Sequence, residues 1–147
     1  MICVDASVAV KWILDEERSD RARALYSAAV ETSVSIVAPP LLPLEVTNIL
    51  RQRMRTTEGL SLFAATQHLD DFLALPIEFH SPAGLHFQAL VLADALGLPA
   101  TYDAHYLALA EHLGCELWTD DQRLIRQVAT GLPFVRWIGD HPATVIG

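Results

Sequence analysis

Four acidic side chains, each beside an apolar segment, carry most of the chemical information in this sequence. Asp5 follows ICV, Glu45 lies within LLPLEVTNIL, Asp103 precedes an Ala- and Leu-rich segment, and Asp121 follows LWTD. Carboxylates repel one another and resist burial, so a fold that gathers them requires a compensating charge. The usual compensation is a hard divalent cation, Mg²⁺ or Mn²⁺. Because such a cation stabilises the charge that develops when a phosphodiester is cut, the four acids predict a metal-dependent nuclease.

The elements that must position these acids follow from the hydrophobic pattern. Strands are expected at 2–4, 34–38, 76–80, 99–101, 115–119 and 134–137, and helices at 6–14, 18–30, 42–54, 60–75, 82–96, 104–113 and 121–129. This alternation predicts an α/β fold with a mostly parallel central sheet and helices on both faces. A chain of 147 residues is expected to form a single domain over 1–147, with the last ~10 residues as a tail.

In open parallel sheets the ligand crevice lies outside the carboxyl ends of the strands. Asp5, Asp103 and Asp121 each follow an expected strand, so they are predicted to emerge at one edge. Glu45 shares a polar stripe of the 42–54 helix with Asn48, and the opposite side of that helix is mostly apolar. The four acids are therefore expected to meet in one site.

Each acid also has an ordinary structural alternative. Asp5, Asp103 and the adjacent pair Asp120 and Asp121 stand where helix N-caps are expected, and one carboxylate can cap a helix while it binds a metal. For Glu45 the alternative is a solvent-facing helix position.

Neighbouring polar side chains extend the candidate site. Ser7 and Thr119 are expected either to hold the carboxylates or a phosphate oxygen through their hydroxyls, or to cap local turns. Asn48 is expected to orient a carboxylate, with a solvated helix position as its alternative. His105 is expected to turn away from Asp103 along the helix, which argues against a role as general base.

In their order and spacing these residues resemble the PIN domain, most closely the VapC-type toxins of type II toxin–antitoxin pairs. The likeness rests on Asp5-Ala6-Ser7 after the first strand, Glu45 with Asn48 one turn on, Asp103 opening a helix, and Thr119-Asp120-Asp121 after a late strand. It runs from Ile2 to about Phe134. The Thr-x-Asp pattern of that family selects Asp121 rather than Asp120.

The resemblance implies a PIN-like fold and a Mg²⁺-dependent endoribonuclease, with Mn²⁺ as a substitute. Asp5, Glu45, Asp103 and Asp121 would be the catalytic metal ligands, supported by Ser7, Asn48 and Thr119. It also implies a structured RNA substrate such as tRNA or rRNA, a small VapB-like antitoxin that occludes the site, and a homodimer. A catalytically inactive PIN module that binds protein or RNA is the alternative, and the presence of all four acids argues against it.

Two other α/β classes with clustered acids fit less well. A phosphoacceptor receiver domain needs a lysine near the last strand, and the only lysine here is Lys11. A haloacid-dehalogenase-like phosphatase needs Asp-x-Asp after the first strand, where this chain has Asp5-Ala6-Ser7.

Composition narrows the expected partners and compartment. A net charge of −8 argues against broad electrostatic binding to duplexes, although two bound divalent cations would halve it. Apolar residues make up 52% of the chain, and the helices at 42–54 and 60–75 are expected to be covered by a partner.

The absence of an 18-residue apolar stretch and of a secretory signal predicts a cytoplasmic protein that does not enter a membrane. Cys3 and Cys115 are then expected to be reduced core residues.

Overall fold

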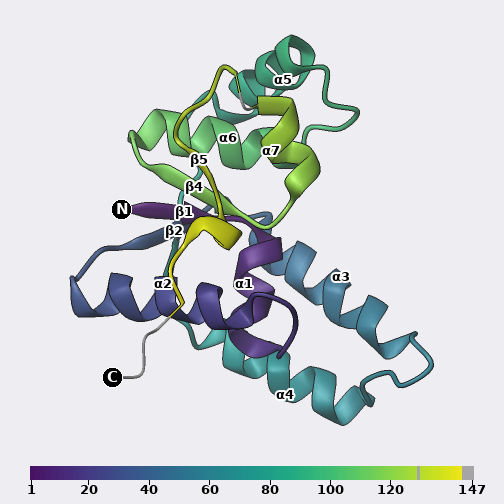
Figure 1. The fold of residues 1–147 in the computed structure, drawn as a ribbon. Helices are drawn as coiled ribbons and strands as arrows, with labels where there is room; N and C mark the ends of the chain where they lie inside the picture. The colour runs from purple at the N-terminus through teal and green to yellow at the C-terminus, as the bar shows by residue number, and fades with distance from the viewer. Residues whose placement is uncertain (129, 144–147) are drawn as a thin grey trace.

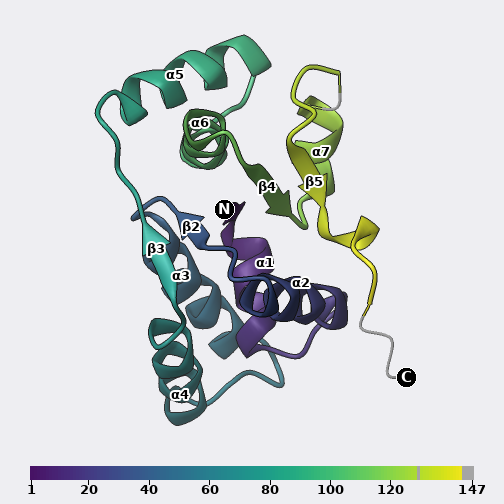
Figure 2. The ribbon, with the colours of Figure 1, turned by 90° about the vertical axis from the view of Figure 1, so that its left-hand side faces the viewer.

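The computed structural model describes residues 1–128 and 130–143. Within them, one parallel sheet has the strand order β3-β2-β1-β4-β5 (Figures 1 and 2). The strands are β1 (Ile2–Val4), β2 (Ile36–Ala38), β3 (Ile77–Phe79), β4 (Glu116–Thr119) and β5 (Val135–Trp137). Because β1 lies between β2 and β4, the first strand of the chain is the centre of the sheet. The predicted α/β fold with a parallel sheet is confirmed.

Helices cover both faces of this sheet. They are α1 (Ala6–Ile13), α2 (Ser19–Glu31), α3 (Leu42–Met54), α4 (Leu62–Leu73), α5 (Leu85–Leu96), α6 (Tyr102–Leu113) and α7 (Gln122–Val128), followed by a 3-10 turn, η1 (Ile138–Asp140). The α5, α6 and α7 helices lie on one side, and α1 and α2 lie on the other (Figure 1). The α3 and α4 helices pack against each other and against α1. No described helix is long and apolar enough to cross a membrane.

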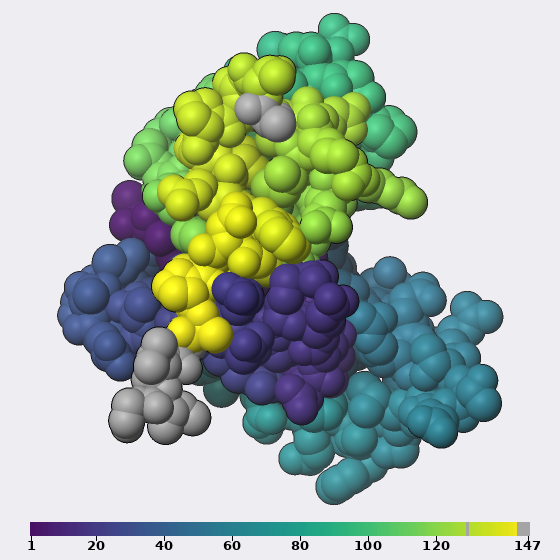
Figure 3. Space-filling view, viewed as in Figure 1, coloured from purple at the N-terminus to yellow at the C-terminus, as the bar shows by residue number. Residues whose placement is uncertain are grey.

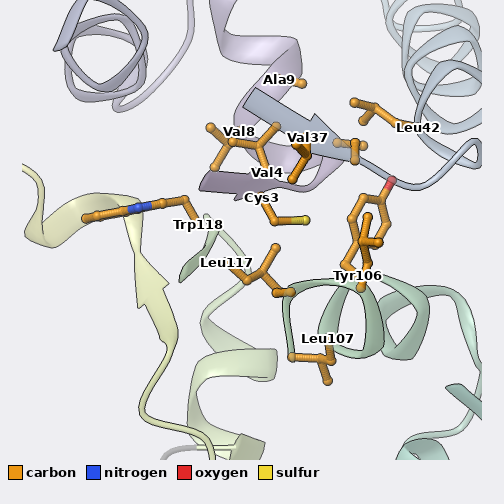
Figure 4. Packing of buried hydrophobic residues seen from close by; sticks show 14 of the residues in the cluster. Cys3, Val4, Val8, Ala9, Val37, Leu42, Tyr106, Leu107, Leu117 and Trp118 are labelled. Carbon is orange, nitrogen blue, oxygen red and sulfur yellow. The ribbon is translucent and has the colours of Figure 1, made fainter. Parts of the chain in front are cut away.

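The core is built around the central strand. Cys3 and Val4 of β1 are fully buried, and Cys3 lies between Val37 of β2 and Leu117 of β4 in the sheet register (Figure 4). Val8 of α1 and Leu107 of α6 belong to the same buried cluster. Strands covered on both faces need apolar side chains in both directions, which is why ICV and IVA read as continuous apolar segments.

The prediction of a strand at 99–101 is wrong. Residues 99–101 form a bend between α5 and α6, and α6 begins at Tyr102, earlier than expected. Gly97 ends α5 with a left-handed φ of 65°, and the Thr101 carbonyl already accepts the amide of His105 at 3.0 Å. The short link between these two turns has no room to pair with the sheet. Asp103 therefore belongs to the first turn of α6 rather than to a strand end.

The ends of the other elements are set by local contacts. Ser61 caps α4 by accepting the amide of Ala64 at 3.1 Å, so this helix begins at Leu62 rather than at residue 60. Near the C-terminus, Ile138 is buried and Arg21 donates to the His141 carbonyl at 2.5 Å. Figure 3 shows this part of the chain against the N-terminal helices. Residues 144–147 of the expected tail lie outside the described residues.

Candidate active site

Asp5 stands at the carboxyl end of the central strand and is 5% exposed. Its Oδ1 accepts the Ser7 hydroxyl at 2.5 Å and the amide of Val8 at 3.2 Å, while its Oδ2 accepts the Thr119 hydroxyl at 2.5 Å. The bond from Val8 makes Asp5 the N-cap of α1. The capping role expected as an alternative is therefore present, and both carboxylate oxygens are held in fixed directions.

The hydroxyls of Ser7 and Thr119 join two turns that are far apart in the sequence. Each donates to Asp5, so each must accept in its remaining contacts. Ser7 Oγ accepts the amide of Asp120 at 2.8 Å, and Thr119 Oγ1 accepts the amide of Asp121 at 3.0 Å. The turn after β1 and the turn after β4 are thereby locked together, and the position of Asp121 is coupled to that of Asp5.

Glu45 lies in the first turn of α3 and is held from α6. The phenol of Tyr106, which is 1% exposed, donates to Glu45 Oε1 at 2.5 Å. Burial, with the charge of Glu45 in support, raises the pKa of Tyr106, so the phenol remains a donor at any ordinary pH. Tyr106 is not among the site residues expected from the sequence. Its place one turn after Asp103, on the same side of a helix, was the available signal.

The acids are close enough to affect one another's ionisation. Burial is the largest cause in each case and raises the pKa of Asp5 to about 7, with hydrogen bonds from Ser7 and Thr119 opposing it and the charge of Asp103 adding to it. Burial likewise raises the pKa of Glu45, again with a contribution from Asp103. Burial also raises the pKa of Asp103, and here the added charge is that of Asp121. Asp103 is therefore the electrostatic link between the other acids.

Asp120 has a different environment from its neighbour Asp121. Arg18, which has a left-handed φ of 65°, donates to both carboxylate oxygens of Asp120 at 2.6 and 3.1 Å. The buried Lys11 lies 3.1 Å from Oδ2, and Trp137 Nε1 donates to Oδ1 at 3.1 Å. Burial favours the neutral acid, but Arg18 and Lys11 outweigh it and lower the pKa of Asp120. Asp120 is thus an anchor in an ion-pair network.

Asp121 caps the helix that follows the site. Its Oδ1 accepts the amides of Arg123 at 2.9 Å and Leu124 at 3.3 Å, at the start of α7. These bonds orient the carboxylate without a cation, in contrast to Asp120. The two adjacent acids therefore differ in environment: Asp120 is paired with cations and Asp121 caps a helix.

Asn48 and His105 lie beside the group of four acids and make no hydrogen bond to it among the described residues. Asn48 is exposed and lines, with Glu45, a hollow of about 450 Å³. His105 uses Nδ1 for the Thr101 carbonyl at 2.6 Å and Nε2 for His86 Nδ1 at 2.9 Å. Both nitrogens of His105 are occupied, as expected for a packing role and not for a general base.

The donor set and the side-chain positions give different answers about a metal ion. Asp5, Glu45, Asp103 and Asp121 offer only carboxylate oxygens, which suit Mg²⁺ or Mn²⁺. Over residues 1–128 and 130–143, however, no three His, Cys, Asp or Glu side chains lie close enough together to hold an ion. The chemistry fits a hard divalent cation, and binding one would require the carboxylates to draw closer.

Comparison with known proteins identifies the family to which the chain belongs. A family model of the PIN domain matches residues 2–130. The chain is 34% identical over 128 residues to Ribonuclease VapC3 of Pyrobaculum aerophilum, covering 84% of this chain and 91% of that protein. Among solved structures, PAE2754 of P. aerophilum has a TM-score of 0.65 at 21% identity, with 94% of this chain and 89% of that one covered. VapC20 of Mycobacterium tuberculosis, described as a sarcin–ricin loop cleaving toxin, has a TM-score of 0.64 at 20% identity, with 92% and 99% covered. The chain belongs to the PIN domain family and, within it, to the VapC-type proteins.

Proposed function

We propose that this protein is a divalent-metal-dependent endoribonuclease that acts as the toxin of a toxin–antitoxin pair. The observation that carries the proposal is the gathering of acids from separate segments at one end of a parallel sheet, where burial and the charge of Asp103 raise the pKa values of Asp5 and Glu45, and burial and the charge of Asp121 raise that of Asp103. A relative named as a ribonuclease, 34% identical over most of both chains, supports RNA as the substrate.

The proposed ligands of the cation are Asp5, Glu45, Asp103 and Asp121. Mg²⁺, or Mn²⁺ in its place, supplies Lewis acidity and lowers the pKa of bound water. The side chains around these ligands act by orientation. Ser7 and Thr119 fix both oxygens of Asp5, and Tyr106 fixes one oxygen of Glu45. Asn48 borders the hollow beside Glu45, where it is positioned to contact the RNA or to orient the carboxylate.

The test is cleavage of total RNA with Mg²⁺, Mn²⁺, Ca²⁺ or excess EDTA, followed by mapping of the cleaved ends. Cleavage is expected with Mg²⁺ and Mn²⁺ and not with EDTA, and Ca²⁺ should fail because its coordination is longer and looser. Asp103→Asn should abolish cleavage. Asp70→Asn, a matched change at an exposed position on α4, should not. Cleavage that persists in EDTA or in Asp103→Asn would overturn the proposal.

One observation favours a second function, that of a catalytically inactive module. No three of the described acids are within reach of one ion, as a binding module without a metal would also show. The two functions differ in a simple measurement. An inactive module binds RNA or a protein with the same affinity in Mg²⁺ and EDTA and leaves the RNA intact.

We further propose a VapB-like antitoxin and a homodimer as partners, and structured tRNA or rRNA as the substrate, in the cytoplasm. Leu44 of α3 is 71% exposed, and Leu62, Phe63 and Leu73 of α4 are also exposed. Apolar side chains gathered on two adjacent helices mark an interaction surface. An arginine of the antitoxin would complement the carboxylates, because its guanidinium pairs with them bidentately. A monomer by light scattering, together with no relief of toxicity by an adjacent reading frame, would contradict this arrangement.

A further inference from the structure

A second pocket adjoins the acidic hollow and has a different chemical character. It has a volume of about 390 Å³ and lies between the β2–α3 link, the start of α5 and the start of α6. Its walls include Pro39, Pro40 and Leu44 on one side and His86, Tyr102 and His105 on the other. Among the described residues that line it, none is acidic. A mainly apolar pocket with few polar groups is suited to a flat, uncharged ligand.

The two cavities are adjacent, because they share lining residues. Leu41, Leu44 and Tyr102 line both the apolar pocket and the hollow that contains Glu45. Tyr102 precedes Asp103 directly in the chain, at the start of α6. A ligand in the apolar pocket would therefore lie next to any group bound at the acids.

Tyr102 has the features of a stacking surface. It is a large aromatic side chain, yet 61% of it is exposed at the mouth of the pocket. Proteins that bind single-stranded nucleic acid commonly place unpaired bases on such rings, and each stacked base contributes about 1–3 kcal/mol. Proline and leucine on the facing wall offer a flat apolar surface for the other side of a base.

The histidine pair gives the pocket a hydrogen-bonding edge with a defined polarity. The Thr101 carbonyl accepts only, so His105 Nδ1 carries the proton, and the neutral ring presents Nε2 as an acceptor. His86 Nδ1 must then donate to His105 Nε2, which leaves His86 Nε2 as an acceptor when His86 is neutral. A base amino group is a donor that matches this acceptor.

We propose that this pocket is a nucleobase subsite, in which an unpaired base next to the cleaved phosphodiester stacks on Tyr102 and is selected by His86. The inference rests on the proposed ribonuclease function and extends it to sequence selection. It assigns an occupant to a concave surface that the acids do not use.

The experiment uses short single-stranded RNAs with 2-aminopurine at each position in turn. Its fluorescence falls when it stacks on an aromatic ring. Asp103→Asn is the background, so that the RNA stays intact. One position is expected to be quenched, and adding Tyr102→Ala should remove this quenching and weaken binding about 5- to 150-fold, the equivalent of one lost stacking contact. Tyr102→Phe retains the ring and should retain the quenching.

Two further variants test the specificity of the quenching and the role of His86 in base preference. Phe87→Ala removes an aromatic ring that is 81% exposed on α5 and does not line the pocket, and it should leave quenching unchanged. In the otherwise wild-type enzyme, His86→Ala should reduce the preference for one base beside the mapped cut while cleavage continues. A thermal melt of each variant checks that the fold is retained.

The outcomes separate the subsite from the proposed function. If wild type cleaves RNA and Tyr102→Ala retains its base preference and quenching, the subsite is overturned and the ribonuclease stands. If wild type does not cleave RNA but one position is quenched through Tyr102, the subsite stands as a binding site and the ribonuclease fails. If Tyr102→Ala abolishes only binding of the product of an adjacent reading frame, the pocket belongs to a protein partner and the subsite is overturned.

Discussion

Tyr106 of α6 donates its phenolic proton to Glu45 of α3, and this 2.5 Å bond joins helices separated by 61 positions in the chain. The phenol is buried and its raised pKa keeps it protonated, so its role as donor does not change with pH. Glu45 can lose or gain a proton, whereas its partner cannot. The bond therefore favours the ionised form of Glu45, which is the form that can bind a cation.

Tyr106→Phe is expected to shift the pH dependence of cleavage. Burial already raises the pKa of Glu45, and the bond from Tyr106 opposes that rise. Without the bond the pKa of Glu45 increases further, so the acid limb of the pH–rate profile should move to higher pH. The rate near pH 6 should fall more than the rate near pH 8. The control is Tyr26→Phe, which removes the hydroxyl of a phenol that packs beside Trp12 and not beside the acids, so the pH–rate profile should stay as in wild type. An unchanged profile for Tyr106→Phe would show that Glu45 does not titrate in the reaction.

Asp120→Asn is expected to lower the stability of the protein, and Asp121→Asn is expected to lower its rate of cleavage, although the two residues are adjacent. Asp120→Asn removes the charge paired with Lys11 and Arg18. Breaking a buried pair typically destabilises a protein by about 3–5 kcal/mol, and this pair should lie at or below the lower end because Arg18 is partly exposed. Asp121→Asn should change stability little, because asparagine is also a good N-cap, but should reduce cleavage by orders of magnitude.

Urea unfolding in EDTA and RNA cleavage in Mg²⁺ measure these two effects separately. A stable, inactive Asp120→Asn together with an active Asp121→Asn would reverse the assignment of the fourth acid. Arg123→Ala, an exposed change in the first turn of α7, serves as the local control for both measurements.

The metal-free protein is expected to lose stability as the pH rises from 5 to 8. Burial raises the pKa of Asp5 from its ordinary value of 3.8 to about 7 in the folded protein, so the folded state retains a proton that the unfolded chain has released. Stability from this proton is complete below about pH 4 and is lost as the pH passes through about 7. The whole loss is of the order of 4 kcal/mol for Asp5 alone, from about 1.4 kcal/mol per pKa unit, and about 3 kcal/mol of it falls between pH 5 and 8. Urea titrations in EDTA at pH 5, 6, 7 and 8 measure it, and Asp5→Asn should flatten the slope. A flat wild-type profile would mean that Asp5 is ionised without penalty.

The sheet and the places of Asp5 and Asp121 after strand ends could be predicted because each rests on a local pattern. The apolar segments ICV and IVA identify buried strands, and Asp5 or Asp121 directly after a strand end identifies the edge where they emerge. The prediction of a strand at 99–101 was wrong because so short a segment between two helices has no hydrophobic pattern of its own. Its hydrogen bonds are set by the end of α5 and the start of α6.

The contacts that orient the acids could not be predicted in the same way. The bond between Tyr106 and Glu45 and the pairing of Arg18 with Asp120 join segments 61 and 102 positions apart. Such partners are decided by the packing of whole helices. No local signal in the sequence favours Arg18 over the other arginines as the partner of Asp120.

Asp103→Asn separates repulsion between the acids from structural hydrogen bonding. The pKa of Asp103 is raised by burial and by Asp121, so at pH 8 its charge disfavours the folded state. Asp103→Asn should therefore melt no lower than wild type in EDTA. Mg²⁺ should raise the melting temperature of wild type more than that of the variant, because only an intact native site gains stability by mass action.

Asp5→Asn is the contrasting variant. An amide cannot accept on both sides, so the bond from Thr119 or those from Ser7 and Val8 would be lost, and part of the relief from repulsion is offset. Thermal melts of all three proteins at pH 8, with EDTA and with Mg²⁺, give the comparison. A marked fall for Asp103→Asn in EDTA, with no difference in the Mg²⁺ response, would make Asp103 a structural residue and remove it from the metal site.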